Sequence, residues 1–176
     1  MKHTLTVLGA TALLSVACIA QAPEPDFSDV FYRLDGEKLI PLERQTGTTK
    51  HDMGGFIYVK TRTTAEFSGT KSPVRFTSGP LAFMVRAMPY SVESDPNATY
   101  VLRKLEQKKS SRLLTFMSGH FSPAGASTSM AQGLPVAFAR YGEGSLKITT
   151  GALAPGEYAL GKTYPGQAVF CFGVDK

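Results

Sequence analysis

Short runs of β-branched and aromatic residues, each ended by glycine or proline, recur along almost the whole chain. In one run Leu81, Phe83 and Val85 alternate with other residues, as side chains on one face of a strand do. The 17 glycines and 11 prolines supply turns between the runs. This spacing, with few credible helices, predicts one all-β domain, an antiparallel β-sandwich of Greek-key or immunoglobulin-like type. The runs are 56–61, 73–77, 81–86, 134–141, 145–149, 157–160 and 169–174.

A β-hairpin is predicted near the start of this domain. Asp35-Gly36 separates two β-rich runs, 30–34 and 37–42. Asp-Gly readily adopts the positive φ values of a two-residue type I′ turn, so the two runs should pair. Pro41 lacks an N–H for the ladder, which predicts that the second strand lies at a sheet edge.

Residues 95–117 allow two interpretations. Asp95-Pro96 suits a helix start, with Asp as N-cap and Pro at the first helical position, and one interpretation is a short helix near 95–109. The alternative is a hairpin that pairs 100–108 with 112–117, and we prefer it because 113–117 has no helical continuation. Residues 118–133 are small and polar, which predicts a long loop.

The first 20 residues have the composition of an export signal. Lys2 supplies the positive start, the apolar run 5–19 is too short for a permanent membrane span, and small residues close it. Cys18 and Ala20 suit the third-last and last positions before a cleavage site. We therefore expect a signal peptide over 1–20 and a mature protein in the periplasm or outside the cell.

Two alternatives to this export signal remain. Residues 14–18 resemble a bacterial lipobox, in which a lipidated Cys18 would anchor the protein to a membrane, although Leu14 lies one place too far upstream. A buried N-terminal helix is the other, and the proline-rich residues that follow argue against it. Residues 21–28 are expected to form an extended spacer and 29–176 the β-sandwich domain.

If Cys18 leaves with the signal, Cys171 is the only cysteine and no intramolecular disulfide can form. Cys171 lies in the run 168–174, which is apolar at nearly every position, as a central strand is. We expect a small buried hydrophobic side chain rather than a catalytic nucleophile.

The residues Leu153-Ala154-Pro155-Gly156-Glu157-Tyr158 combine a leucine, a Pro-Gly turn and a tyrosine that enters a strand. Leu153, Gly156 and Tyr158 fit a tyrosine corner, in which the phenol bonds back to nearby main chain. An ordinary turn is the alternative. With the terminal Cys171-Phe172-Gly173-Val174-Asp175, this segment resembles the C-terminal pattern of uncharacterised secreted proteins of acidobacterial type, a resemblance that implies no activity.

Motifs that carry chemistry are mostly missing from the sequence. Gly54-Gly55 lacks the Lys-Ser/Thr or third Gly of a phosphate loop, and no Gly-x-Ser-x-Gly elbow occurs. His51, Asp52 and His120 match no known metal-ligand spacing, so we expect no metal and no cofactor. They leave one enzymatic alternative, a small secreted hydrolase, which requires these three side chains to converge in one pocket.

Basic residues cluster in the predicted hairpin of 100–117. The formal charge of +5 falls to +4 without Lys2, which is too weakly basic for a dedicated nucleic-acid binder. The preferred interpretation of the cluster is a solvated edge that resists aggregation, and the alternative is contact with an anionic envelope component or an acidic protein as partner. Membrane contact is expected only if Cys18 is lipidated. The clustered residues are Arg103, Lys104, Lys108, Lys109 and Arg112.

Hydrophobic residues at 43% and charged residues at 19% are enough to bury a core, which excludes wholesale disorder. The sequence thus favours an exported, non-catalytic β-sandwich that binds or supports something at the cell envelope, because loops of a sandwich can carry recognition.

Overall fold

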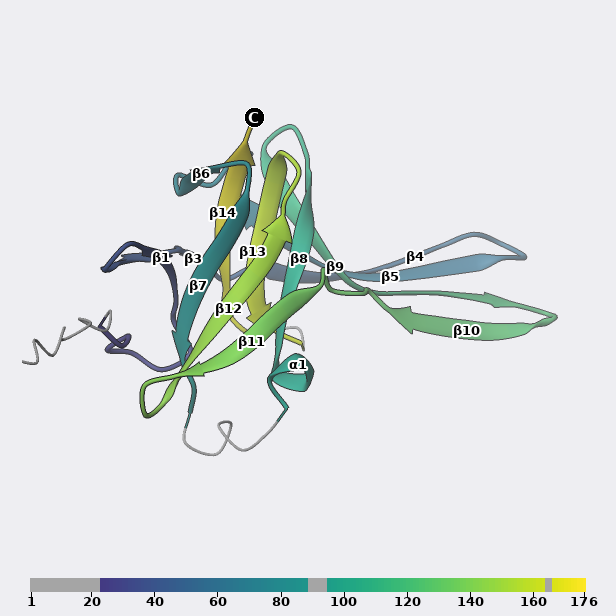
Figure 1. The fold of residues 1–176 in the computed structure, drawn as a ribbon. Helices are drawn as coiled ribbons and strands as arrows, with labels where there is room; N and C mark the ends of the chain where they lie inside the picture. Colours follow the sequence, from purple (N-terminus) through teal and green to yellow (C-terminus); the bar gives the residue numbers. More distant parts are fainter. Residues whose placement is uncertain (1–22, 89–94, 164–165) are drawn as a thin grey trace, which may run out of the picture.

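The computed structural model describes residues 23–88, 95–163 and 166–176. The predicted signal peptide and Cys18 lie outside these residues. The described chain is an all-β sandwich of two sheets, from which a long arm of paired strands projects (Figure 1). The strand pairs are antiparallel, apart from one parallel pairing at the edge strand β6.

The first sheet has five strands in the order β11-β12-β7-β1-β2. Its central strand, β7, pairs with β12 on one side and with β1 on the other. The strands are β1 (Phe31–Asp35), β2 (Lys38–Pro41), β7 (Pro80–Arg86), β11 (Val136–Tyr141) and β12 (Ser145–Ala152).

The second sheet has nine strands, seven of them in the order β3-β14-β13-β8-β9-β5-β4. Its first and last strands are joined by only two residues, so the sheet must curl until its ends approach each other. Strand β10 pairs with β9, and β6 pairs with β14. The bounds are β3 (Glu43–Gln45), β4 (Thr48–Gly54), β5 (Val59–Ser68), β6 (Arg75–Thr77), β8 (Tyr100–Gln107), β9 (Ser111–Ser122), β10 (Gly125–Met130), β13 (Gly156–Lys162) and β14 (Val169–Asp175).

Apolar side chains fill the space between the two sheets. Phe83 from the first sheet and Phe172 from the second are fully buried, with ring centroids 4.9 Å apart. A second, smaller core lies within the curl of the second sheet and includes Phe67, Leu114 and Cys171. Burial raises the pKa of the Cys171 thiol to about 12, as expected for an inert buried cysteine.

The predicted hairpin of β1 and β2 forms, with its turn one residue later than expected. Asp35 pairs with Lys38, which leaves Gly36 and Glu37 as the two loop residues. Gly36 has φ +60°, and Glu37 is not among the residues with positive φ. Positive φ at the first loop position alone is the type II′ pattern, so the type I′ prediction is wrong. Strand β2 lies at the sheet edge, as Pro41 predicts.

Both interpretations of 95–117 hold in part. A single helical turn, α1 (Pro96–Thr99), begins at Asp95, whose carboxylate accepts a hydrogen bond from the Asn97 N–H at 2.9 Å. The chain then forms the hairpin of β8 and β9, which pair through Gln107 and Arg112 at its tip. Beyond Glu106 and Leu113, β8 pairs with β13 and β9 with β5, so the preferred hairpin is confirmed at its tip only.

The arm corrects two predictions. Residues 56–58 were expected to begin a strand, but they form the tip between β4 and β5, where Phe56 is 98% exposed. The turn must fall there because the polar strand β4 pairs with β5 along its whole length. Residues 118–133 were expected to be a loop, yet most of them extend β9 and form β10, since β5 provides β9 with a partner.

Residues 23–28, most of the expected spacer, are held against the sandwich. The Glu24 carboxylate accepts hydrogen bonds from the Glu143 N–H at 2.9 Å and the Ser145 hydroxyl at 2.7 Å. The Arg86 guanidinium donates to the carbonyl of Pro25 at 3.3 Å. The folded unit therefore includes residues upstream of the expected domain start at 29.

Candidate functional site

The predicted basic cluster is not one continuous surface. Arg112 is fully buried and Arg103 nearly so, which corrects the prediction that both contact a partner. The Arg103 guanidinium lies 5.3 Å from the ring centroid of Phe116, and burial lowers its pKa. Only Lys104, Lys108 and Lys109 of the cluster are exposed.

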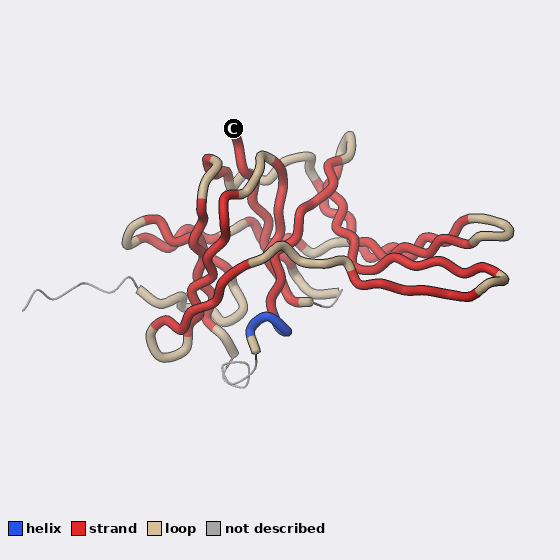
Figure 2. The backbone as a smooth tube through the Cα atoms, turned by 45° about the vertical axis from the view of Figure 1, so that its right-hand side comes forward, coloured by secondary structure: helices blue, strands red, loops and turns tan. Residues whose placement is uncertain are grey.

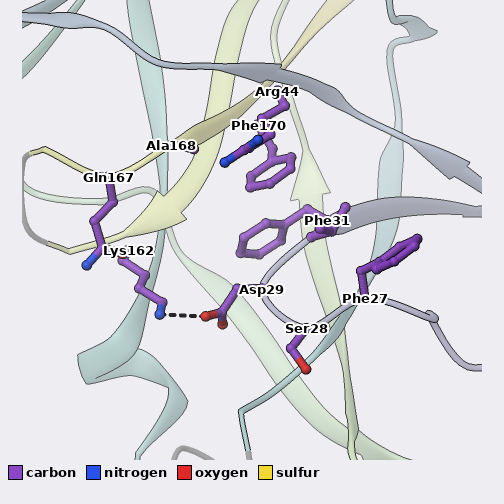
Figure 3. Close-up of a pocket in the computed structure, with 10 residues that line it drawn as sticks. Phe27, Ser28, Asp29, Phe31, Arg44, Lys162, Gln167, Ala168 and Phe170 are labelled. Atoms are coloured by element: carbon purple, nitrogen blue, oxygen red, sulfur yellow. Dashed lines mark hydrogen bonds and ion pairs between the residues drawn. The ribbon is translucent and has the colours of Figure 1, made fainter.

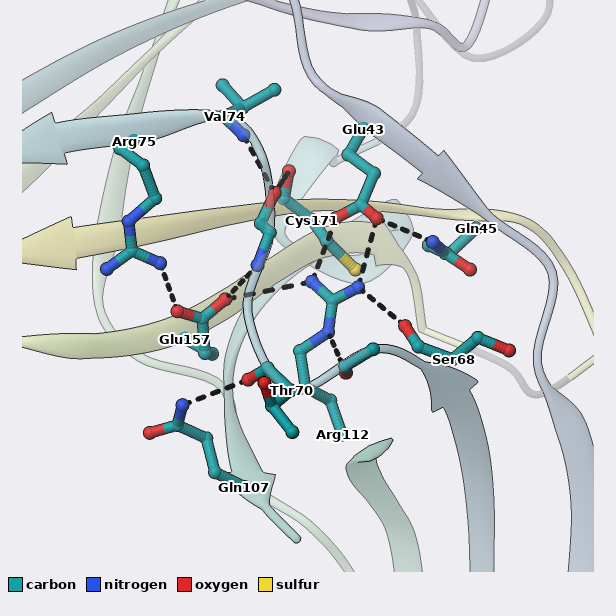
Figure 4. Close-up of polar contacts among 12 residues, drawn as sticks. Glu43, Gln45, Ser68, Thr70, Val74, Arg75, Gln107, Arg112, Glu157 and Cys171 are labelled. Carbon is teal, nitrogen blue, oxygen red and sulfur yellow. Dashed lines mark hydrogen bonds and ion pairs between the residues drawn. The ribbon is translucent and has the colours of Figure 1, made fainter. Parts of the chain in front are cut away.

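Arg112 belongs to a buried ion network at the second core (Figure 4). Its guanidinium donates to both carboxylate oxygens of Glu43, at 2.8 and 3.0 Å, and to the carbonyls of Ser68 and Gly69, each at 3.1 Å. Glu157 lies 3.7 Å away. Every buried side-chain nitrogen and oxygen of this group has a partner among the described residues, so the network stabilises the fold rather than offering a binding site.

Glu157 connects this network to the C-terminus of the chain. Its carboxylate accepts from the Ser72 N–H at 2.7 Å and pairs with Arg75. Arg75 also pairs with Asp175 in the last strand. The residues of the network thus bind β3, β6, β9, β13 and β14 together.

We expect acid to destabilise the protein through these carboxylates. Burial opposes ionisation of Glu43, but hydrogen bonds from Arg112, Ser72 and Gln45 outweigh it and lower the pKa of Glu43 below its usual 4.5. Hydrogen bonding to Arg75 lowers the pKa of Asp175. A folded pKa below the unfolded pKa gives stability that is complete above about pH 4.5 and is lost as pH falls through the folded value.

Urea unfolding midpoints should therefore fall between pH 5 and pH 3 in the wild type. The fall should be smaller in Glu43→Gln, which has no proton to gain at that position. Glu37→Gln is the matched control, because Glu37 is an exposed turn residue. An identical pH dependence of wild type and Glu43→Gln would contradict the expectation.

A cavity of about 460 Å³ lies beside the N-terminal segment (Figure 3). Phe27, Phe31 and Phe170 form its apolar wall. Asp29 faces it, but its carboxylate already binds the Lys162 ammonium at 2.6 Å and accepts from the Tyr100 hydroxyl at 2.9 Å. Ser28, Arg44 and Gln167 supply the other polar side chains of its lining.

The arm is the more distinctive feature. We define it as residues 51–63 and 117–130, which form a four-stranded sheet in the order β4-β5-β9-β10. Figure 2 shows it extending well beyond the sandwich. Because residues paired across strands share a face, the register assigns every arm residue to one of two faces.

One face of the arm is polar. Two cross-strand rows form it, Asp52-Arg62-Ser118-Ser129 and Gly54-Lys60-His120-Ser127. Tyr58 and six residues of these rows line a shallow groove of about 310 Å³, which we call the polar groove. The six are Lys60, Arg62, Ser118, His120, Ser127 and Ser129. The Tyr58 ring stacks on the His120 imidazole, with centroids 5.0 Å apart and an interplanar angle of 16°.

The two cations of the polar groove differ in their partners. The Arg62 guanidinium donates to the Thr115 hydroxyl and lies 3.1 Å from the Glu106 carboxylate, which also pairs with Lys108. The Lys60 ammonium makes no hydrogen bond or ion pair with any residue in the described part of the chain. One free cation therefore stands beside an aromatic ring and several serine hydroxyls.

The opposite face of the arm is apolar. Its rows are His51-Thr63-Met117-Met130, Met53-Thr61-Gly119-Thr128 and Val59-Phe121-Ala126. None of these residues is Asp, Glu, Lys or Arg. We call this surface the apolar face.

The arm separates the residues of the hydrolase alternative. His51 lies on the apolar face, and its ring nitrogen is 3.1 Å from the Thr63 hydroxyl. His120 lies on the polar face, bonded to Ser127 at 2.9 Å. Asp52 shares that face but is two strands away, about 9.5 Å across the sheet. The three side chains do not converge.

Sequence reasoning missed Tyr58, Lys60 and Arg62 as site residues. A signal was present, because Met117, Gly119 and Phe121 alternate with Ser118, His120 and Ser122. The small polar residues obscured this alternation.

No helix in the described ranges is long and apolar enough to cross a membrane. Comparisons with protein-family models, with curated proteins and with solved structures found no match. The function must therefore be argued from the geometry of this chain, in which the two-faced arm is the most distinctive surface.

Proposed function

We propose that this protein is an exported, non-catalytic β-sandwich that binds an anionic polysaccharide of the cell envelope through the polar groove of its arm. Export follows from the predicted signal peptide at 1–20. The resemblance of the C-terminal segment to secreted bacterial proteins agrees with that location.

The composition of the polar groove carries the proposal. Lys60 and Arg62 attract carboxylate or sulfate groups, and the hydroxyls of Ser118, Ser127 and Ser129 suit the hydroxyls of a sugar. Tyr58 adds an amphipathic ring with a polar end, a residue type common at binding surfaces. The groove is shallow and open, as a site for a polymer that extends beyond it must be.

Two further observations favour binding over catalysis. His51 and His120 lie on opposite faces of a single-layer sheet, so they cannot act on one substrate. Cys171 is buried, and its thiol stays protonated at neutral pH.

The exposed Lys108, which shares Glu106 with Arg62, extends the basic surface from the groove towards the predicted cluster.

Alginate, a polyuronate, tests the proposal, with dextran as the neutral comparison. We expect the chain from Gln21 to bind alginate but not dextran, measured by isothermal titration calorimetry. A hydrogen bond to a charged group contributes about 1.5–3 kcal/mol, so Lys60→Gln should weaken alginate binding at least about tenfold. Raising the salt from 0.1 to 1 M shortens the Debye length from about 10 to about 3 Å and should also weaken binding.

Lys38→Gln is the matched control, because Lys38 is an exposed lysine on β2, in the sandwich rather than the arm. Its affinity for alginate should equal that of the wild type. Equal binding of wild type to alginate and dextran would reject the proposal, and so would equal losses in Lys60→Gln and Lys38→Gln.

A further inference from the structure

The apolar face is left uncovered by the rest of the described chain. Its large side chains, Met53, Met117, Phe121 and Met130, are 36–76% exposed, and Ile57 at the adjoining tip is 72% exposed. Monomeric soluble proteins rarely leave contiguous apolar patches of more than a few hundred Å² in water. A sheet that alternates apolar and polar residues normally packs its apolar side against another layer.

The exposed area is close to what a stable interface requires. An aromatic or similarly large side chain offers about 150–250 Å², so these five side chains present roughly 440–730 Å² at their observed exposures. Val59, Ala126 and the threonines between them bring the face towards about 800 Å² per partner, the typical size for specific protein association.

The charge distribution favours a second copy of the same chain as the covering layer. The apolar face carries no Asp, Glu, Lys or Arg, so two copies can meet without opposing like charges. The charged residues Lys60, Arg62 and Asp52 all lie on the opposite face and would stay in water. A two-fold dimer needs only one self-complementary patch, and this face supplies one.

The centre of the face can accommodate such packing. Gly119 lies there between Thr61 and Thr128, and a Cβ at this position would meet the Ser127 carbonyl oxygen at 2.6 Å and the Thr61 hydroxyl at 2.9 Å. Gly119 itself presents no side chain, so a bare position separates the large side chains of Met117 and Phe121 along β9. Sheets that pack face to face interdigitate side chains in this manner.

We propose that two copies of this protein associate through the apolar faces of their arms, sheet against sheet, to form a symmetric dimer. The two polar grooves then point outwards on opposite sides of the paired arms. If the polar groove binds polysaccharide as proposed above, the dimer is bivalent, and avidity for a long polymer exceeds the affinity of one groove. The dimer itself does not depend on that function.

Sedimentation equilibrium of the chain from Gln21, which contains all described residues, tests the dimer. We expect twice the chain mass at micromolar concentration for the wild type. A triple variant, Met53→Ser, Phe121→Ser and Met130→Ser, should sediment as a monomer with an unchanged far-UV circular dichroism spectrum. Phe27→Ser is the control, because Phe27 is 66% exposed, similar to Phe121 at 60%, but lies on the sandwich. It should remain dimeric.

Disulfide crosslinking adds a geometric test that does not require the triple variant to fold. Thr61 lies near the centre of the apolar face, so Thr61→Cys should form an interchain disulfide on oxidation. Ser118→Cys lies on the polar face and should not. The buried Cys171 does not interfere.

A wild type that stays monomeric at 100 µM or more would overturn the proposal. A monomer that instead floats with anionic lipid vesicles would also overturn it and would assign the apolar face to a lipid surface. Equal crosslinking at Thr61→Cys and Ser118→Cys would exclude the face-to-face arrangement. Alginate binding by a monomeric wild type would leave the proposed function standing, so the two proposals fail separately.

Discussion

Replacing Arg112 with methionine should lower the free energy of unfolding by about 3–5 kcal/mol, measured by urea denaturation at pH 7. The substitution keeps an unbranched side chain of comparable length but removes the cation between Glu43 and Glu157. Glu157 is 1% exposed and Arg112 is fully buried, so water cannot replace the lost partner. Removing one partner of a buried ion pair destabilises a protein by much more than the net contribution of the intact pair, because the other charge stays buried without a partner.

Lys109→Met is the matched control, because Lys109 comes from the same predicted cluster but is exposed. Its unfolding free energy should stay within about 0.5 kcal/mol of the wild type. The double variant that combines Arg112→Met with Glu43→Gln should regain part of the lost free energy of unfolding. It removes one of the two carboxylates that Arg112→Met leaves without a cation. Equal stability of Arg112→Met and Lys109→Met would mean that the network does not hold the second sheet together.

Tyr158→Phe should lower the free energy of unfolding by about 1–3 kcal/mol. The Tyr158 hydroxyl donates to the carbonyl oxygen of Ala154 at 2.5 Å, four residues upstream, as a tyrosine corner requires. Its ring is buried and stacks on Phe172 with centroids 5.6 Å apart. Phenylalanine keeps the ring in place and removes only the hydrogen bond, so the loss measures that bond.

The rest of the corner fits the same interpretation. Leu153 packs against the main core, and Gly156 has φ +156°, a backbone conformation that favours glycine. Tyr58→Phe is the control, because Tyr58 is exposed on the arm, and a change within about 0.5 kcal/mol is expected. An unfolding midpoint of Tyr158→Phe equal to that of the wild type would reduce the corner to an ordinary turn.

The local sequence was sufficient to predict a feature when the residues that fix it lie within one short segment. The hairpin of β1 and β2 formed because Gly36 provides the positive φ that a two-residue turn needs. The corner at Tyr158 formed because donor and acceptor lie four residues apart. Cys171 is buried because its strand is apolar on both sides.

The arm was missed because its stability is not local. The residues 118–130 have the composition of a loop, and they form strands only because β5 offers an edge to β9. The polar strand β4 likewise extends along the opposite edge of β5. Phe56, which favours a strand by its type, is consequently placed in the turn.

The sequence by itself determined the fold class, the main apolar strands and the corner, because alternation, turn residues and short-range hydrogen bonds act within a few residues. Only the tertiary structure decided which basic residues are exposed to solvent. Arg112 and Lys109 lie in one hairpin, yet Arg112 meets Glu43, which is 69 residues away, and is buried. Charge pairing across such separations depends on which strands become neighbours, and strand order is settled by the packing of the whole sheet rather than by any one segment.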